Sequence, residues 1–100
     1  MSMEVRFENE DLEKLATDPK SDGGFSRDIV KAFRKRVQFI RSAKDERDFW
    51  AFRRVGFEKL KGARRGEYSM RLNDQFRLIL KLESGDKGRI VVIKSIEDYH

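Results

Sequence analysis

Residues 67–82 contain two stretches of alternating apolar and polar side chains, separated by the polar segment Asn-Asp-Gln. Such alternation predicts half-buried strands, and the short polar connection predicts that they form an antiparallel hairpin. A shift of one residue in register would move all the apolar side chains of one strand to the other face of the sheet. An odd loop of three residues, 73–75, avoids this shift and pairs Arg71 with Arg77. The hairpin therefore places two arginines side by side on the face away from the core.

Two adjacent guanidinium groups repel each other unless an anion lies between them. The predicted pairing of Arg71 with Arg77 therefore indicates that this hairpin has a function in binding an anion.

Two helices are predicted before the hairpin. Residues 9–18 have apolar side chains at helical spacing and acidic residues in the first turn, where the helix dipole favours them. Residues 18–24 contain the only proline and a pair of glycines, which predicts a loop. Ser26 is suited to cap a second helix over residues 26–43. One apolar stripe follows this helix, and it consists of Ile29, Phe33, Val37 and Ile40.

A strand is predicted towards each end of the chain. Residues 3–7 alternate between apolar and charged side chains, as a half-buried strand does. Residues 89–96 are almost continuously apolar, which predicts a central strand covered on both faces. A turn is predicted at residues 83–88, directly before this strand. The aromatic residues Phe49, Trp50 and Phe52 are predicted to be core anchors on a short helix or turn.

The 100 residues predict one domain, and the composition limits its chemistry. There are 23 Lys and Arg against 18 Asp and Glu, a net charge of +5, which indicates either a polyanionic partner or a solvated, charge-rich surface. The absence of cysteine and the single histidine exclude structural disulfides, thiolate metal sites and histidine-rich metal sites. No apolar run is long enough to span a membrane, and the acidic beginning of the chain is unlike a signal peptide. We therefore expect no metal, no cofactor and no membrane partner, and a cytoplasmic location.

The candidate chemical groups lie near the two arginines. Glu58 is predicted to lie in the loop segment that leads into the hairpin, just before the basic segment 59–65. The only histidine, His100, follows Asp98 and Tyr99 directly after the last predicted strand. A carboxylate, an imidazole and fixed guanidinium groups are what RNA cleavage by 2′-OH attack requires. Taken singly, however, a terminal histidine is often incidental, and the basic segment is equally typical of a turn before a hairpin.

The predicted helix 26–43 has a basic face that includes Arg34 and Arg41. This face is either solvated, as charged outer faces usually are, or in contact with phosphate groups.

The segment "LKGARRGEYSMRLNDQFRLIL", residues 60–80, together with the terminal "EDYH", resembles the HigB-type branch of the RelE toxin superfamily. These are toxins of bacterial type II toxin–antitoxin systems. The resemblance is specific in the order and spacing of residues in the C-terminal part, whereas the first half matches only as a strand followed by helices. Phe76 stands where the family usually has tryptophan, and Ala63 where an aspartate is common.

The resemblance implies a RelE-like α+β fold, in which an N-terminal strand and two helices pack on one face of a mainly antiparallel sheet. It also implies an mRNA interferase that cuts the message in the ribosomal A site, leaving a 2′,3′-cyclic phosphate and a 5′-OH. The implied partners are the ribosome, mRNA and a cognate helix-turn-helix antitoxin of the HigA type, with operator DNA contacted only through the antitoxin.

The resemblance also implies roles for single residues. Arg77 matches the arginine that contacts the scissile phosphate, and His100 matches a general acid. Glu58 matches a position of a catalytic glutamate or histidine and is the candidate general base. Asp98 and Tyr99 match the residues that orient the base or the imidazole. RNA contacts are expected from cations in the C-terminal part, Lys61, Arg64, Arg65 and Arg71, and on the basic helix, Arg34 and Arg41.

The main alternative is a non-catalytic module of the same fold that binds RNA or the ribosome. A transcriptional regulator is less favoured, because the sequence contains no helix-turn-helix pattern.

Overall fold

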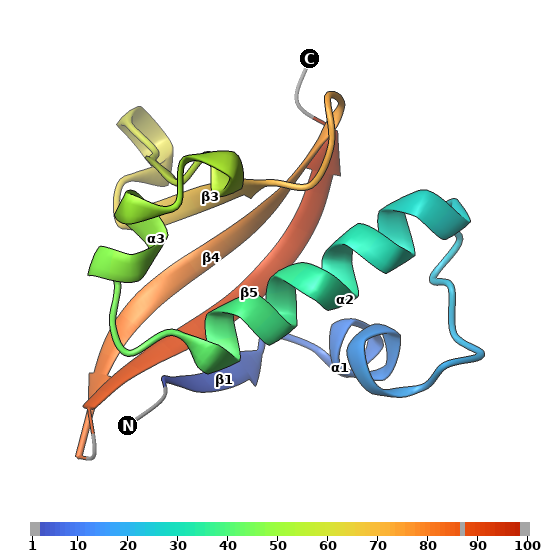
Figure 1. Ribbon diagram of the computed structural model, residues 1–100, viewed down its shortest axis with the longest axis horizontal. Helices are drawn as coiled ribbons and strands as arrows, with labels where there is room; N and C mark the ends of the chain where they lie inside the picture. The colour runs from blue at the N-terminus through green and yellow to red at the C-terminus, as the bar shows by residue number, and fades with distance from the viewer. Residues whose placement is uncertain (1–2, 87, 99–100) are drawn as a thin grey trace.

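A computed structural model of the chain describes residues 3–86 and 88–98. Its framework is a five-stranded sheet with the strand order β1-β5-β4-β3-β2. The strands are β1 (Glu4–Phe7), β2 (Glu58–Lys59), β3 (Glu67–Arg71), β4 (Phe76–Gly85) and β5 (Gly88–Asp98). Only β1 and β5 pair in parallel, so the sheet is mainly antiparallel. The long helix α2 (Arg27–Ser42) crosses one face of this sheet, and α1 (Glu10–Thr17) lies beside α2 (Figure 1). The predicted α+β fold is confirmed.

The predicted register of the β3–β4 hairpin is also confirmed. Arg71 pairs with Arg77, and Met70 pairs with Leu78. Met70 and Leu78 are fully buried beneath the helices, because the alternation of side chains directs them to the helix-covered face. We call the opposite face, on which Arg71 and Arg77 lie, the outer face.

Both predicted helices form, and each has the capping bond that its sequence suggests. The side chain of Asn9 accepts a hydrogen bond from the backbone N–H of Leu12 at the start of α1. Ser26 does the same for Ile29 at the start of α2. Such caps satisfy backbone N–H groups that the first turn of a helix leaves without partners. All four residues of the predicted apolar stripe on α2 are buried.

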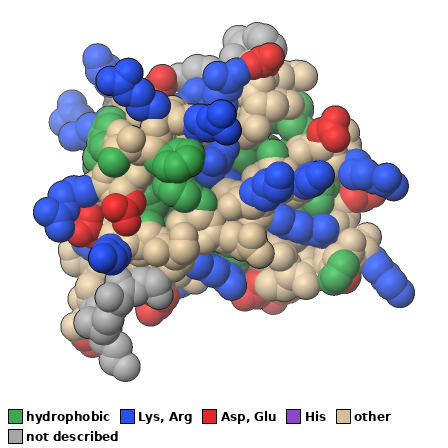
Figure 2. Space-filling view, in the orientation of Figure 1, with side chains coloured by type: hydrophobic (Ala, Val, Ile, Leu, Met, Phe, Trp, Pro, Cys, Tyr) green, Lys and Arg blue, Asp and Glu red, His purple; other side chains and the backbone are tan. Residues whose placement is uncertain are grey.

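The prediction of three aromatic core anchors was correct for only one of them. Phe49, on the short helix α3 (Arg47–Ala51), is 1% exposed, but Trp50 and Phe52 are 53% and 51% exposed. Trp50 contacts the ring of Phe57 edge-on, with centroids 4.7 Å apart, and Phe52 packs against Phe39. Successive residues of a helix point in different directions, so Trp50 does not face inward with Phe49, and Phe52 follows the end of the helix. The rings of Trp50 and Phe52 therefore cover the core from outside. Apolar side chains bordered by Lys and Arg are visible in this region in Figure 2.

The structure also moves several predicted boundaries. Glu58 was expected in a loop, but it lies in β2, which pairs with β3 through Glu58 and Ser69. The strands β4 and β5 extend beyond their apolar stretches, so that Gly85 pairs with Gly88. The turn between the two strands is therefore shorter than the predicted turn at residues 83–88. β5 lies between β1 and β4, which confirms its predicted central position. In the described part of the chain, no helix is long and apolar enough to cross a membrane.

Candidate active site

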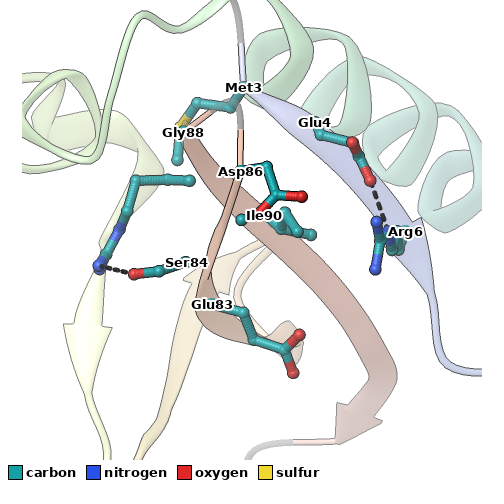
Figure 3. Close-up of a pocket in the computed structure, with 10 residues that line it drawn as sticks. Met3, Glu4, Arg6, Glu83, Ser84, Asp86, Gly88 and Ile90 are labelled. Atoms are coloured by element: carbon teal, nitrogen blue, oxygen red, sulfur yellow. Dashed lines mark hydrogen bonds and ion pairs between the residues drawn. The ribbon is translucent and has the colours of Figure 1, made fainter.

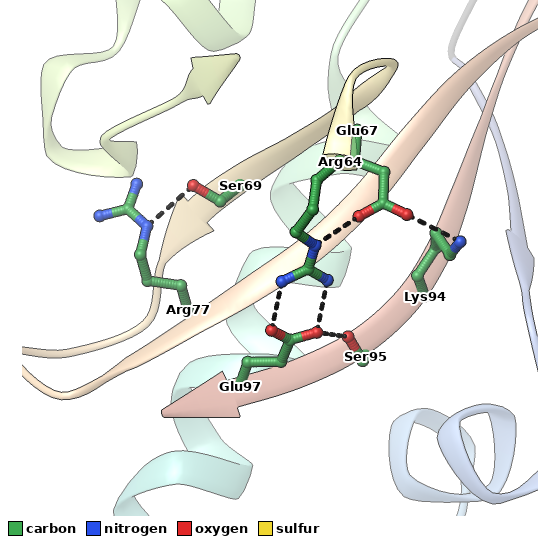
Figure 4. A network of polar contacts seen from close by, with 7 residues as sticks. All are labelled: Arg64, Glu67, Ser69, Arg77, Lys94, Ser95 and Glu97. Atoms are coloured by element: carbon green, nitrogen blue, oxygen red, sulfur yellow. Dashed lines mark hydrogen bonds and ion pairs between the residues drawn. The ribbon is translucent and has the colours of Figure 1, made fainter. Parts of the chain in front are cut away.

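Arg77 lies on the outer face, near the start of β4, and its guanidinium group is held by two neighbours. Its Nε donates a hydrogen bond to the hydroxyl of Ser69, 2.9 Å away on β3 (Figure 4). Its Nη2 donates a hydrogen bond to the backbone carbonyl of Gly56, in the turn before β2. The side chain is only 11% exposed, and Ser69 is fully buried. The orientation of Arg77 is therefore fixed by the protein before any ligand binds.

Glu58 reaches the same position from the edge strand β2. Its Oε2 lies 3.9 Å from Nη2 of Arg77, and its side chain is 55% exposed. The pairing of Glu58 with Ser69 directs the carboxylate to the outer face, since residues opposite one another share a face. The structure thus brings together a carboxylate open to solvent and a fixed guanidinium group.

The two members of the arginine pair have different partners within the chain. Arg71 forms an ion pair with Asp74 in the hairpin loop, while Arg77 turns towards Gly56. Gly56 has a φ of 59°, and a Cβ atom there would lie 3.2 Å from Cβ of Arg71 and 3.6 Å from Nη2 of Arg77. The backbone at Gly56 therefore approaches both arginines closely. Binding of an anion at this pair stays a prediction.

Arg64 is held on the outer face by two carboxylates. It lies in the loop between β2 and β3, in the single turn η2 (Gly62–Arg64). Its Nη1 and Nη2 donate to the two carboxylate oxygens of Glu97 at 2.5 and 2.6 Å, and its Nε donates to Glu67 at 2.9 Å (Figure 4). Glu67 also pairs with Lys94, at 2.9 Å. The bond from Arg64 lowers the pKa of Glu97 to about 2, so this carboxylate is ionised at neutral pH.

The end of β5 lies beside these groups. Glu97 pairs with Arg77 across the β4–β5 ladder, and Asp98 pairs with Phe76. The side chain of Gln75 donates a hydrogen bond of 2.9 Å to the carboxylate of Asp98. Tyr99 and His100 lie outside the described residues, so their predicted roles stay predictions.

The remaining predicted RNA contacts fall on two sides of the molecule. Lys61 and Arg65 flank η2 and are exposed. Arg34 and Arg41 are on α2, which lies behind the sheet when the outer face is viewed from the front (Figure 4). Arg34 donates hydrogen bonds to the carbonyl groups of Leu15, Asp18 and Ser21, so it fixes the loop between α1 and α2. Arg41 is exposed.

Sequence reasoning missed Gly56, Ser69 and Glu97. Ser69 is a small polar residue on the outer side of a predicted strand, which is a weak signal. The contact between Glu97 and Arg64 joins residues 33 positions apart, and no local pattern indicates it.

A hollow lies elsewhere, at the end of the sheet where β4 turns into β5. Its volume is about 840 Å³, and it is lined by that turn and by β1 (Figure 3). The charges on its wall are mixed, with Glu4 and Arg6 paired to each other at 2.5 Å. Among residues 3–86 and 88–98, no cluster of three or more His, Cys, Asp or Glu side chains could hold a metal ion. The outer face around Arg77 is therefore the better candidate site.

The sequence pattern of one known family extends over nearly the whole chain. The family described as "RelE-like toxin of type II toxin-antitoxin system HigB" matches residues 5–100. The chain belongs to this HigB-like toxin family. It is accordingly a toxin of the RelE-like type, from a type II toxin–antitoxin system. Among curated proteins, no sequence relative was found.

Solved structures similar to this HigB-like toxin share its fold at low sequence identity. A YoeB/ParE toxin from Agrobacterium tumefaciens has a TM-score of 0.58 and 15% identity, covering 98% of this chain and 100% of that one. A chain of the YoeB–YefM toxin–antitoxin complex from Staphylococcus aureus has a TM-score of 0.56 and 23% identity, over 100% and 99%. A chain of the RelBE2 toxin–antitoxin complex from Mycobacterium tuberculosis has a TM-score of 0.52 and 20% identity, over 99% and 100%. These similarities establish the fold.

Proposed function

We propose that this HigB-like toxin is an endoribonuclease that cleaves mRNA in the ribosomal A site. The observation that carries the proposal is the distance of 3.9 Å between the carboxylate of Glu58 and the guanidinium group of Arg77 on the outer face. A base and a fixed cation at this separation can act on a 2′-OH and on the adjacent phosphate at the same time.

In the proposed reaction, Glu58 removes the proton from a ribose 2′-OH. The oxygen attacks the adjacent phosphorus, and the bond from phosphorus to the 5′ oxygen breaks. His100 gives a proton to the leaving 5′ oxygen, so the products are a 2′,3′-cyclic phosphate and a 5′-OH. Arg77 stabilises the additional negative charge on the phosphorane. The proposed reaction uses side chains, without a metal ion or a cofactor.

The other predicted residues have supporting roles in this proposal. Asp98 and Tyr99 orient the imidazole of His100. Arg71 and the exposed residues Lys61 and Arg65 attract the RNA backbone, whose affinity for cations depends on salt.

We propose that the chain acts in the cytoplasm and is neutralised by a helix-turn-helix antitoxin of the HigA type. Two of the similar structures come from toxin–antitoxin complexes, which supports a partner of this class. The exposed cations of α2, which include Arg41, offer a surface of opposite charge to an acidic antitoxin segment. Operator DNA would be contacted only through the antitoxin.

The test is to express the toxin without antitoxin and to map the 5′ ends of cellular mRNA. Breaks in ribosomal A-site codons are expected with the wild-type chain. Arg77→Ala, Glu58→Gln and His100→Ala should each reduce cleavage by roughly 10²-fold or more. Arg47→Ala is the matched control, because Arg47 is an exposed arginine in an ion pair with Asp45. Undiminished cleavage in all three site variants would contradict the proposal.

One observation favours the alternative of a non-catalytic module that binds RNA or the ribosome. Two nitrogen atoms of Arg77, Nε and Nη2, already donate to Ser69 and Gly56 within the chain, as they would in a structural arginine. This alternative predicts salt-sensitive ribosome binding without new 5′ ends in the message.

A further inference from the structure

We propose that Glu97 is a positioning residue of the cleavage site, and that it acts by clamping Arg64 to the end of β5. This inference rests on the proposed function and extends it, because Arg64 becomes a positioning residue instead of an RNA ligand. We call the group Arg64, Glu67, Lys94 and Glu97 the outer clamp.

The geometry of the outer clamp is that of a specific contact. Both carboxylate oxygens of Glu97 face the guanidinium group of Arg64, at 2.5 and 2.6 Å. Two parallel bonds of this kind fix orientation as well as distance. The hydroxyl of Ser95 donates a further bond of 2.8 Å to Glu97. Glu67 completes the arrangement by bridging Arg64 and Lys94 (Figure 4).

The clamp joins the two parts of the proposed site. Arg64 is in the loop that follows β2, the strand of Glu58, whereas Glu97 precedes Asp98 directly and pairs with Arg77 across the ladder. β2 contains only two residues, so its pairing with β3 provides little to hold it at the edge of the sheet. Fixing the loop therefore fixes the base, Glu58, relative to Arg77 and the end of β5.

The charge balance of the clamp argues against a phosphate-binding role for Arg64. Two cations and two carboxylates give the four residues no net charge. A phosphate would have to displace Glu97 from both of its bonds to Arg64. Lys61 and Arg65 are exposed in the same loop and are better suited to attract the RNA backbone.

A positioning role of Glu97 and a phosphate-binding role of Arg64 predict different effects of Glu97→Gln on the kinetics of cleavage. If Glu97 positions the site, Glu97→Gln and Arg64→Ala should each lower kcat roughly 10-fold to 100-fold with KM almost unchanged. The double variant should be no worse than either single variant, because both remove the same contact. If Arg64 binds phosphate, Glu97→Gln should instead lower KM, since it releases the arginine. That result, or strictly additive losses, would overturn the proposal.

Glu46→Gln is the control for a general effect of losing an ion pair. It breaks the ion pair between Glu46 and Arg89, which is 2.9 Å long, against 2.5 Å for Arg64 and Glu97. The two pairs are similarly exposed, but the control pair lies at the other end of the sheet. This variant should retain the wild-type kcat.

A measurement that does not depend on cleavage separates this inference from the proposed function. The backbone N–H of Arg65 donates to the carbonyl of Gly62 inside η2, and its hydrogen exchange reports opening of the loop. Glu97→Gln should accelerate this exchange at least 10-fold, and Glu46→Gln should not. If the wild-type chain cleaves no RNA, the proposed function fails, while unchanged exchange in Glu97→Gln would by itself overturn the clamp.

Discussion

The guanidinium group of Arg77 and the carbonyl group of Gly56 are joined by a hydrogen bond between residues 21 positions apart. Gly56 has the left-handed backbone conformation that favours glycine, and it ends the single turn η1 (Arg53–Val55). The turn before β2 thus supplies the acceptor that fixes the central arginine of the candidate site.

Gly56→Ala should impair both stability and cleavage. The left-handed conformation costs a residue with a Cβ atom about 1–2 kcal/mol, and the new atom would lie 3.2 Å from Cβ of Arg71. The turn must shift, and the acceptor of Arg77 shifts with it. Urea unfolding and the cleavage rate would be measured on the same preparation. Gly24→Ala is the matched control, because Gly24 has a φ of +83° with nothing within 4 Å of the new atom. It should lower stability while cleavage stays at the wild-type rate, and equal losses of cleavage in the two variants would contradict the account of Arg77.

Arg34→Ala should lower the free energy of unfolding by about 2 kcal/mol, because hydrogen bonds from a charged donor are worth more than neutral ones. Arg34 donates to the carbonyl group of Leu15 in α1 and to those of Asp18 and Ser21 in the loop that follows. Arg41→Ala, on the same helix but exposed, should change the stability by less than about 0.5 kcal/mol. Thermal unfolding followed by circular dichroism compares the two. Similar stabilities would show that the bonds of Arg34 contribute nothing.

Stability should fall in acid because of Glu97. Its pKa in the folded chain is about 2, below the ordinary value of 4.5, since Arg64 stabilises the ionised form. The contribution to stability is therefore complete above about pH 4.5 and is lost as the pH falls towards 2. Urea midpoints measured between pH 7 and pH 2 should decline less steeply in Glu97→Gln than in the wild type. Parallel curves would mean that the pair is not formed in solution.

The aromatic residues near α3 should differ strongly in their contribution to stability. Phe49→Ala should cost about 3–5 kcal/mol, as is usual for a fully buried ring. Trp50→Ala should cost only about 1–2 kcal/mol, because Trp50 is 53% exposed and contacts mainly one ring. Chemical unfolding of the two variants measures the difference. The fluorescence of Trp50 provides a second check, since a half-exposed indole should be quenched by acrylamide in the folded state. A protected tryptophan would contradict the described surface.

The sequence by itself determined the elements whose signals are local. The alternation around residues 73–75 fixed the register that pairs Arg71 with Arg77, because a shift of one residue would expose the apolar face. The apolar stripe and the cap at Ser26 determined α2 in the same way. The continuous apolar run of β5 determined its central position.

Only the tertiary structure decided which groups meet on the outer face. Glu58 reaches Arg77 because the short strand β2 pairs with β3, and a two-residue strand leaves no periodic pattern in the sequence. The bond that Arg64 makes to Glu97, across β4, was equally invisible in the sequence, and the predicted RNA contact of Arg64 stays a prediction. Ion pairs and hydrogen bonds between distant segments depend on where the chain brings each side chain, and alternation or helical spacing does not specify that.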